Sequence, residues 1–305
     1  MEINLITRKS PLALVQSNIV AEKIKNKFPN VNPNIIPITS EGDKISAPLH
    51  LVGGKGLFVS NLEEALRKGS ADFAIHSLKD VPAQLENKFE IVGCMKRGDP
   101  SDSILLKEKN NIKDLADGSI IATSGPRRSA QLLAFNNTFK IVPIRGNIET
   151  RIDIFKKNKL DGLIVATAAL QRLKIKLNYI QKLDYSIMLP AANQGIIGIE
   201  MYKKNITNDL KEVSAAINHR RTKFIADVER AIVKHLDGDC NSAIAVICQH
   251  KQKNEYELLI RAMNQSGSKM IEEAMIIEED NVSSQMQDIT KKLDEKDAKK
   301  IIHEK

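Results

Sequence analysis

The residue best placed to do chemistry in this sequence is an aspartate in a short charged stretch, His76-Ser77-Leu78-Lys79-Asp80-Val81-Pro82. The preceding run Ala71-Asp72-Phe73-Ala74-Ile75 has the pattern of a short buried strand, and Pro82 lacks the N–H that would continue a sheet. We therefore expect Asp80 just past a strand end, where ligands bind in open α/β sheets, as an ionised carboxylate beside Lys79. The alternative is an ordinary Asp-Val-Pro turn with a solvated lysine.

Arginines and hydroxyl residues follow three further predicted strands, at 119–122, 140–144 and 162–166. They lie in the segments Thr123-Ser124-Gly125-Pro126-Arg127-Arg128, Arg145-Gly146-Asn147-Ile148-Glu149-Thr150-Arg151 and Gln171-Arg172. Several arginines after successive strands are expected to converge on one crevice and to bind carboxylates through bidentate forks. Scattered surface charge is the alternative. Nucleic acid is a weaker one, since no recognised motif or stacking aromatic accompanies the arginines.

Arg8 and Ser10 stand between a predicted first strand and a predicted helix. Ser10 is expected to cap that helix and Pro11 to begin it, and its apolar face is predicted to hold Leu12, Val15, Ile19 and Ile24. Free backbone N–H groups and the two side chains then point to one spot, which suits a carboxylate. An ordinary capped helix with a solvated arginine explains the same pattern.

The segment Leu51-Val52-Gly53-Gly54-Lys55-Gly56-Leu57-Phe58 is rich in glycine but has neither the Walker spacing nor the G-x-G-x-x-G fingerprint. A nucleotide site is therefore not predicted. The glycines favour a flexible segment that carries Lys55 over a cleft, ahead of a helix capped by Ser60 and Glu63.

The three cysteines, Cys94, Cys240 and Cys248, are too few for a disulfide framework and lack a C-x-x-C zinc pattern. No metal is predicted, and Cys94 is expected in the core. Cys240 follows Leu236-Asp237-Gly238-Asp239, where a glycine turn is expected to end a helix and expose the thiol. A lone loop cysteine is often structural, and the two neighbouring aspartates disfavour a thiolate.

The chain of 305 residues has 46 Lys and Arg against 38 Asp and Glu, a formal charge of +8 that attracts anions of any kind. No leader peptide or membrane span is evident, so a cytosolic protein is expected. The pattern predicts an α/β fold with two lobes, comprising residues 1–95 with 194–212, and residues 96–193. Residues 213–305 are predicted to form a small α+β C-terminal domain with a solvated lysine-rich tail. Two lobes joined by two crossings resemble the periplasmic-binding-protein type II architecture.

The stretch at 76–82 resembles a motif of the hydroxymethylbilane synthases, also called porphobilinogen deaminases. The resemblance recurs, in family order, at Val52–Phe58, Thr123–Arg128, Arg145–Arg151, Gln194–Gly198 and Leu236–Cys240. It implies a cytosolic, monomeric enzyme of haem biosynthesis that condenses four porphobilinogen molecules into hydroxymethylbilane. It also implies a dipyrromethane cofactor bound to Cys240 through a thioether.

On this resemblance Asp80 is the catalytic residue, which stabilises cationic pyrroles and moves protons. The implied cofactor- and substrate-binding residues are Arg8, Ser10, Lys55, Ser77, Lys79, Thr123, Ser124, Arg127, Arg128, Arg145, Gly146, Arg151, Arg172 and Gln194. The sequence departs from the commonest family pattern at Glu41, Leu51, Gly125-Pro126 and Asp239, which affects loop contacts and two turns. A carboxylate-binding or regulatory protein without catalysis, on the same two-lobed fold, is the alternative function.

Overall fold

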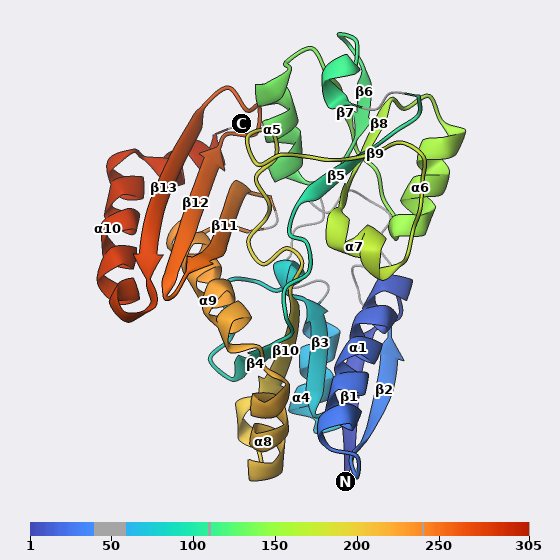
Figure 1. Ribbon diagram of the computed structural model, residues 1–305, viewed down its shortest axis with the longest axis vertical. Helices are drawn as coiled ribbons and strands as arrows, with labels where there is room; N and C mark the ends of the chain where they lie inside the picture. The colour runs from blue at the N-terminus through green and yellow to red at the C-terminus, as the bar shows by residue number, and fades with distance from the viewer. Residues whose placement is uncertain (40–58, 109–110, 240, 305) are drawn as a thin grey trace.

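The computed structural model describes residues 1–39, 59–108, 111–239 and 241–304 (Figure 1). Within these ranges the chain forms two five-stranded sheets and one three-stranded sheet, each covered by helices. In Figure 1 the first sheet lies at the bottom in blue, cyan and gold, and the second lies at the top in green. The three-stranded sheet, in orange and red, lies beside them, so the chain forms two lobes and a third, smaller domain.

The first sheet has the strand order β2-β1-β3-β10-β4. Its strands are β1 (Glu2–Arg8), β2 (Asn32–Ile38), β3 (Phe73–Ser77), β4 (Phe89–Cys94) and β10 (Ile197–Tyr202). Residues alternate between the two faces of a strand, so Ile3 and Leu5 pack under α1 (Pro11–Lys27) and α8 (Asn208–Ile217). Ile6 packs on the other face under α4 (Ser60–Arg67).

The second sheet has the strand order β7-β6-β8-β5-β9. Its strands are β5 (Asp102–Leu106), β6 (Ile120–Ala122), β7 (Lys140–Val142), β8 (Gly162–Ala166) and β9 (Ile180–Lys182). Helix α5 (Pro126–Phe135) packs on one face, and α6 (Ile148–Lys157) and α7 (Thr167–Arg172) pack on the other. Each face therefore has its own apolar core.

The two sheets share one topology. In each, the fourth strand in spatial order is antiparallel to both neighbours, and it is the strand that the chain forms directly after crossing from the other lobe. β5 follows the first crossing and β10 follows the second. This pattern, with the third domain, confirms the predicted fold class.

Strands β5 and β9 were missed by the sequence prediction, which placed the first strand of the second lobe at residue 119. β5 begins with Asp102 and Ser103, which are buried although they are polar. Only three apolar residues were therefore left to indicate a buried strand. β9 has three residues and lies at the sheet edge, too short for any period to show.

The two crossings lie side by side. The N–H of Met95 donates to the carbonyl of Ile197, and the N–H of Gly98 donates to the carbonyl of Gly195, both at 3.0 Å. Gly195 has φ +85, and a Cβ there would lie 2.8 Å from the Gly98 oxygen. Only glycine therefore fits where the crossings touch.

The domain limits remain a prediction. Leu210, Val213 and Ile217 of α8 pack in the core of the first sheet. We therefore propose that the first lobe extends beyond residue 212 to the end of α8.

The third domain is an antiparallel sheet of β11 (Ala243–Gln252), β12 (Glu255–Met263) and β13 (Met270–Glu278). Helices α9 (Arg220–His235), α10 (Val282–Glu295) and α11 (Ala298–His303) pack on it. The prediction of a solvated tail is wrong for α11, because Ala298 and Ile302 are buried in this core. The lysines of α11 interrupt its short apolar pattern, which is why the sequence prediction missed this helix. None of the described helices is long and apolar enough to cross a membrane.

The first helix begins as predicted. The N–H of Ala13 donates to Ser10 Oγ at 3.3 Å, and Pro11 is the first helical residue. The predicted apolar face is right at Ile24, and the partly buried Ile19 packs against the same core, but Leu12 and Val15 are only partly buried. The helix buries a small and partly polar face instead, Ala13, Gln16, Ser17, Val20, Ala21 and Ile24.

The predicted cap of the next helix is also wrong. α4 starts at Ser60 itself, with Val59 before it and no side-chain cap. The carbonyl of Val59 accepts the N–H groups of Leu62 and Glu63, and the Val59 side chain is buried. Packing of Val59 therefore fixes the start of this helix.

The close approach of the third domain to α5 can be tested at Gly267, which has φ +71 in the turn after β12. A Cβ there would lie 2.1 Å from the carbonyl oxygen of Ala130. We expect Gly267→Ala to lower the free energy of unfolding by on the order of 3 kcal/mol, through strain and overpacking. Gly118 is the control: it has φ +78 and nothing within 4 Å, so Gly118→Ala should cost about 1 kcal/mol. Equal losses in urea unfolding would contradict the contact.

Candidate functional site

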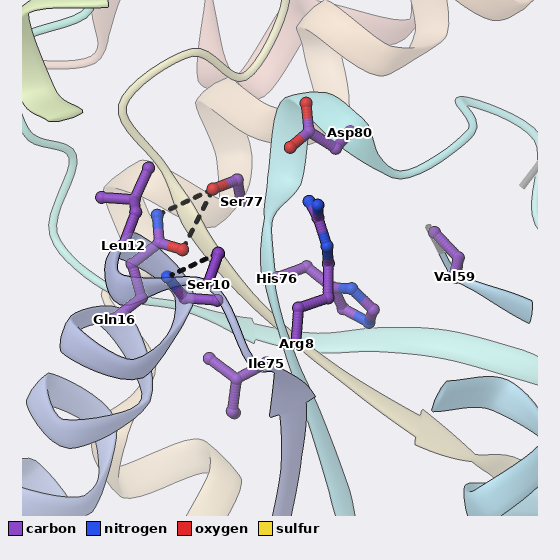
Figure 2. A pocket seen from close by; sticks show the side chains of 10 residues that line it. Arg8, Ser10, Leu12, Gln16, Val59, Ile75, His76, Ser77 and Asp80 are labelled. Carbon is purple, nitrogen blue, oxygen red and sulfur yellow. Dashed lines mark hydrogen bonds between the residues drawn. The ribbon is translucent and has the colours of Figure 1, made fainter. Parts of the chain in front are cut away.

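Asp80 ends a short 3-10 helix, Leu78–Asp80, that continues directly from β3. Its side chain is exposed, whereas Leu78 is fully buried and anchors the turn. A pocket of about 60 Å³ lies beside Asp80, and Arg8, Ser10 and His76 are among the residues that line it. Figure 2 shows the Arg8 side chain extending from β1 toward the Asp80 carboxylate. The predicted place of Asp80, past a strand end, is confirmed.

The serines of the pocket are held by α1. Gln16 Nε2 donates to Ser77 Oγ at 2.8 Å, and Ser77 Oγ lies 3.0 Å from Gln16 Oε1 (Figure 2). Ser10 accepts the Ala13 N–H as the helix cap. Gln16 was not predicted, because it is buried on a helix face where an apolar residue would be expected.

Beneath the pocket lies a buried acid–base pair that the sequence reasoning also missed. His76 Nε2 and Glu200 Oε2 are 2.8 Å apart, and both side chains are buried. Burial, and then the charge of Glu200, raises the pKa of nearby Glu63 to about 7. The His76–Glu200 pair links β3, which leads to Asp80, to β10.

In the second lobe the central residue is Asp102, which is fully buried. Arg127 Nη2 lies 2.8 Å from Asp102 Oδ2, and Arg128 Nη2 lies 2.6 Å from Oδ1. Burial raises the pKa of Asp102, but the charges of Arg127, Arg128 and Lys79 outweigh it and lower the pKa to about 2. Asp102 thus stays ionised and holds both arginines at the start of α5. The sequence offered no signal for it beyond a carboxylate in an unrecognised strand.

The two arginines make backbone contacts as well. Arg127 Nη1 donates to the carbonyl of Leu189 at 2.7 Å, and Arg128 Nη1 donates to the carbonyl of Ile164 at 3.3 Å. Burial lowers the pKa of Arg127. These contacts fix the positive charge of the two arginines in a largely desolvated place. Their role as ligands for carboxylates stays a prediction.

Gln194 connects the two lobes. Lys79 Nζ donates to Gln194 Oε1 at 3.1 Å, and Gln194 Nε2 donates to Asp102 Oδ1 at 3.1 Å and to the carbonyl of Pro100 at 2.7 Å. Lys79 is an exposed residue whose amine donates to Gln194. Desolvation of this amine, with the charge of Arg128, lowers the pKa of Lys79 to about 8, against the opposite effects of Asp80 and Asp102.

The loop before α6 needs its glycine. Gly146 has φ +102, and a Cβ there would lie 2.7 Å from Thr150 Cγ2. The carbonyl of Gly146 accepts a hydrogen bond from Arg151 Nε at 2.8 Å. The turn therefore fixes the direction of the Arg151 guanidinium.

The pKa of Arg151 depends on the charges that surround it. Burial and the positive charges of Arg128, Arg145 and Arg8 lower the pKa of Arg151 to about 10, whereas the charge of Asp80 raises it. Arg8 and Asp80 belong to the first lobe and the other arginines belong to the second. The predicted residues of both lobes are therefore within electrostatic range of one another.

Thr123 and Ser124 hold the turn between β6 and α5. Thr123 is buried, and the N–H of Gly125 donates to its Oγ1 at 3.5 Å. Ser124 Oγ contacts the carbonyl of Ile144 and accepts the Ile144 N–H at 2.9 Å. The unusual Gly125-Pro126 pair fits, because Pro126 is the first residue of α5.

Arg172 lies at the crossings. Its Nη2 donates to the carbonyl of Gly195 at 2.7 Å, and burial lowers its pKa to about 10. The structure thus brings Arg172 to the joint between the lobes, next to Gln194.

Lys55, Cys240, Glu41 and Leu51 lie outside the described residues. The chain reaches Cys240 from the end of α9, where the Gly238 N–H donates to the carbonyl of Val233 at 2.9 Å. The Asp239 carboxylate accepts the Asn241 N–H at 2.9 Å and the Ser242 hydroxyl at 3.0 Å. Asp239 therefore shapes a turn in place of the glycine common in the resembled family.

The described residues thus combine one exposed carboxylate with a set of lysine and arginine side chains. Such a site suits a ligand with several carboxylates whose reaction develops positive charge near Asp80. Among the same residues, no group of histidine, cysteine and acidic side chains is arranged to hold a metal ion.

Comparison with known proteins gives the following matches. Residues 3–209 match the model of the family described as porphobilinogen deaminase, dipyromethane cofactor binding domain. The chain is 37% identical over 275 residues to the porphobilinogen deaminase of Alkaliphilus metalliredigens, covering 90% of this chain and 86% of that protein. It is 38% identical over 254 residues to that of Lawsonia intracellularis, covering 82% of each.

Among solved structures, the chain is similar to a probable amino-acid ABC transporter extracellular-binding protein from Bacillus subtilis. The TM-score is 0.42 at 12% identity, over 71% of this chain and 90% of that one. Scores of this size say nothing about function.

The role of Asp102 can be tested through pH. Its pKa lies near 2 in the folded chain against a reference value of 3.8, so its contribution to stability is present above about pH 4 and is lost as the pH falls toward 2. Asp102→Asn should cost on the order of 3 kcal/mol near pH 7, because two buried arginines lose their partner. The difference from wild type should shrink by roughly 1 kcal/mol between about pH 6 and about pH 3.

The measurement is urea unfolding across this pH range, and the control is Asp153→Asn, which changes an exposed aspartate on α6. A difference between wild type and Asp102→Asn that does not vary with pH would contradict the assignment.

Proposed function

Because the chain belongs to the porphobilinogen deaminase family, we propose that it is a transferase that catalyses the hydroxymethylbilane synthase reaction of tetrapyrrole biosynthesis. Each of four porphobilinogen molecules loses its aminomethyl nitrogen as ammonia and joins the preceding ring head to tail. Water then releases the open tetrapyrrole. Four porphobilinogens and one water thus give one hydroxymethylbilane and four ammonia. Its cytosolic location and its monomeric state stay predictions.

The observation that carries this proposal is the surplus of positive charge facing Asp80. The pKa values of Lys79 and Arg151 are lowered by burial and by other cations, including Arg128. Each porphobilinogen brings an acetate and a propionate, and these carboxylates relieve that repulsion when they bind. A site with this charge favours ligands that are acidic at their edges.

The residues present fit a dipyrromethane cofactor. This group carries carboxylates, and the side chains between the lobes are predominantly N–H and O–H donors. When bound, it supplies the pyrrole carbon to which the first substrate ring is joined. We assign its attachment to the Cys240 thiol, and Arg127, Arg128, Arg145, Arg151 and Arg172 are the guanidinium groups proposed to hold its carboxylates and those of the growing chain.

Asp80 is proposed as the catalytic residue. One of its carboxylate oxygens hands a proton to the departing amine, and the carboxylate then stabilises the cationic pyrrole that remains. After the rings join, the same oxygen accepts the proton lost from the ring carbon, which restores the aromatic pyrrole. Its exposure at the end of the 3-10 helix leaves both oxygens accessible to a ring.

The remaining predicted residues have binding roles in this proposal. Lys79, held by Gln194, orients a carboxylate next to Asp80. Ser77 and Ser10 offer hydroxyls in the pocket that Arg8 and Asp80 also line. Thr123, Ser124 and Gly146 shape the two loops that carry the arginines, and Lys55 is assigned to substrate contact from the sequence alone.

The alternative, a carboxylate-binding protein without catalysis, needs no cysteine. We therefore expect intact-protein mass spectrometry to find one dipyrromethane on the wild-type chain. Cys240→Ser should carry none, whereas Cys248→Ala, which changes a buried cysteine of the third domain, should keep it. A bare wild-type chain after expression in cells that make porphobilinogen would favour the alternative.

Removing the charge of Asp80 should stop elongation without loss of binding. We expect Asp80→Asn to lower kcat for porphobilinogen consumption by at least about 100-fold, because charge stabilisation and proton transfer both depend on this carboxylate. Glu86→Gln is the control, since it removes an exposed negative charge from the same segment. Normal turnover in Asp80→Asn would refute the catalytic role.

Lys79 predicts a pH dependence. Because its pKa is lowered to about 8, its amine loses charge as the pH rises through that value. KM for porphobilinogen should therefore rise by roughly threefold to tenfold between about pH 7 and about pH 9. Lys79→Arg should remove most of this rise, because guanidinium stays charged. The measurement is KM for porphobilinogen as a function of pH in the wild type and in Lys79→Arg. The same rise in both proteins would exclude Lys79 as the titrating group.

A further inference from the structure

Arg230 of α9 makes an unusual set of contacts with the first lobe. Its Nη1 donates to the carbonyl of Val81 at 3.3 Å, and its Nη2 donates to the carbonyls of Pro82 at 2.6 Å and Ala83 at 3.1 Å. The side chain is partly buried, and burial lowers its pKa. One guanidinium group therefore binds three successive carbonyls in the segment that directly follows Asp80.

These contacts act on the backbone that carries Asp80. The 3-10 helix ends at Asp80, and the N–H of Val81 closes it by donating to the carbonyl of Leu78 at 3.2 Å. Leu78 and Val81 are buried in one cluster with Ala226, which lies one helical turn before Arg230 on α9. The same face of α9 thus packs under the Asp80 turn and binds the carbonyls beyond it.

The neighbouring residue ties α9 to the crossings between the lobes. Glu229 is fully buried and accepts hydrogen bonds from Arg97 Nη1 at 2.6 Å, the N–H of Asn193 at 2.6 Å and the N–H of Cys248 at 2.7 Å. Residues 229 and 230 therefore fix α9 against both crossings and against the Asp80 segment. Five residues after Arg230 the helix ends, and the chain continues to Cys240.

We propose that Arg230 is a positioning residue that sets the Asp80 carboxylate relative to the third domain, in which Cys240 follows α9 in the sequence. The inference rests on the proposed function, because it assigns Arg230 an effect that acts through Asp80. The planar fork of arginine is what reaches several carbonyls at once, and a lysine ammonium of similar charge cannot replace that geometry. A displacement of the catalytic group by about 1 Å is enough to slow a reaction on the order of 100-fold.

The test compares Arg230→Lys and Arg230→Met with Arg220→Lys, which changes an exposed arginine at the other end of α9. We expect both Arg230 variants to lower kcat by about 10- to 100-fold. KM should change by less than about twofold, and the cofactor adduct should remain in the intact mass. Arg220→Lys should behave as wild type. Normal kcat in the Arg230 variants, with only a lowered urea midpoint, would show a structural role and overturn the inference.

A double-mutant cycle separates this inference from the proposed function. If Arg230 acts through Asp80, then Arg230→Lys should lower kcat by less than about twofold further in an Asp80→Asn background. Equal fold losses in both backgrounds would overturn the positioning role while leaving Asp80 catalytic. Full activity of Asp80→Asn alone would instead refute the catalytic role proposed for Asp80, through which Arg230 is inferred to act.

Discussion

The arrangement of the site depends on the buried carboxylate of Asp102. The guanidinium groups of Arg127 and Arg128 would repel each other in a desolvated space. The carboxylate of Asp102, which pairs with both, offsets this repulsion. One negative charge against two positive charges leaves an excess, and this excess lies next to Lys79 and Arg151, whose pKa values fall as a result of burial and of cations such as Arg128. The second lobe therefore presents positive charge without losing its own packing.

The topology explains why this charge meets Asp80. Each lobe receives its fourth strand directly after a crossing, so β5 and β10 start at the joint and point away from it into their own sheets. Asp102 opens β5, and Gln194 lies just before β10, which places them within 3.1 Å of each other. Asp102, at the start of the second lobe, is thereby hydrogen-bonded to the segment that leads into β10 of the first lobe. Lys79, which follows β3, extends this hydrogen-bonded series through Gln194.

The sequence predicted the parts of this site that local rules determine. Asp80 follows a strand that Pro82 prevents from continuing, and Ser10 caps a helix that Pro11 begins, because both depend on residues within a few positions. Asp102 was missed because its partners are 25 and 26 positions away in the chain, and a buried polar residue then weakens the strand pattern that would reveal it. Gln16 was missed for the same reason, since its partner Ser77 is 61 positions away. Long-range polar contacts leave no period in the sequence.

The opposed charges also explain why the site needs rigid supports around Asp80. A carboxylate that faces several cations loses its catalytic value if it folds back onto one of them, because the pair then neutralises itself. Leu78 buries the turn from below, and Arg230 holds the carbonyls beyond it, so the backbone of Asp80 is fixed from both sides. Lys79, the nearest cation in sequence, donates to Gln194, which in turn donates to Asp102. In the proposed function, the cations bind the acidic edges of a substrate and Asp80 stabilises its cationic ring.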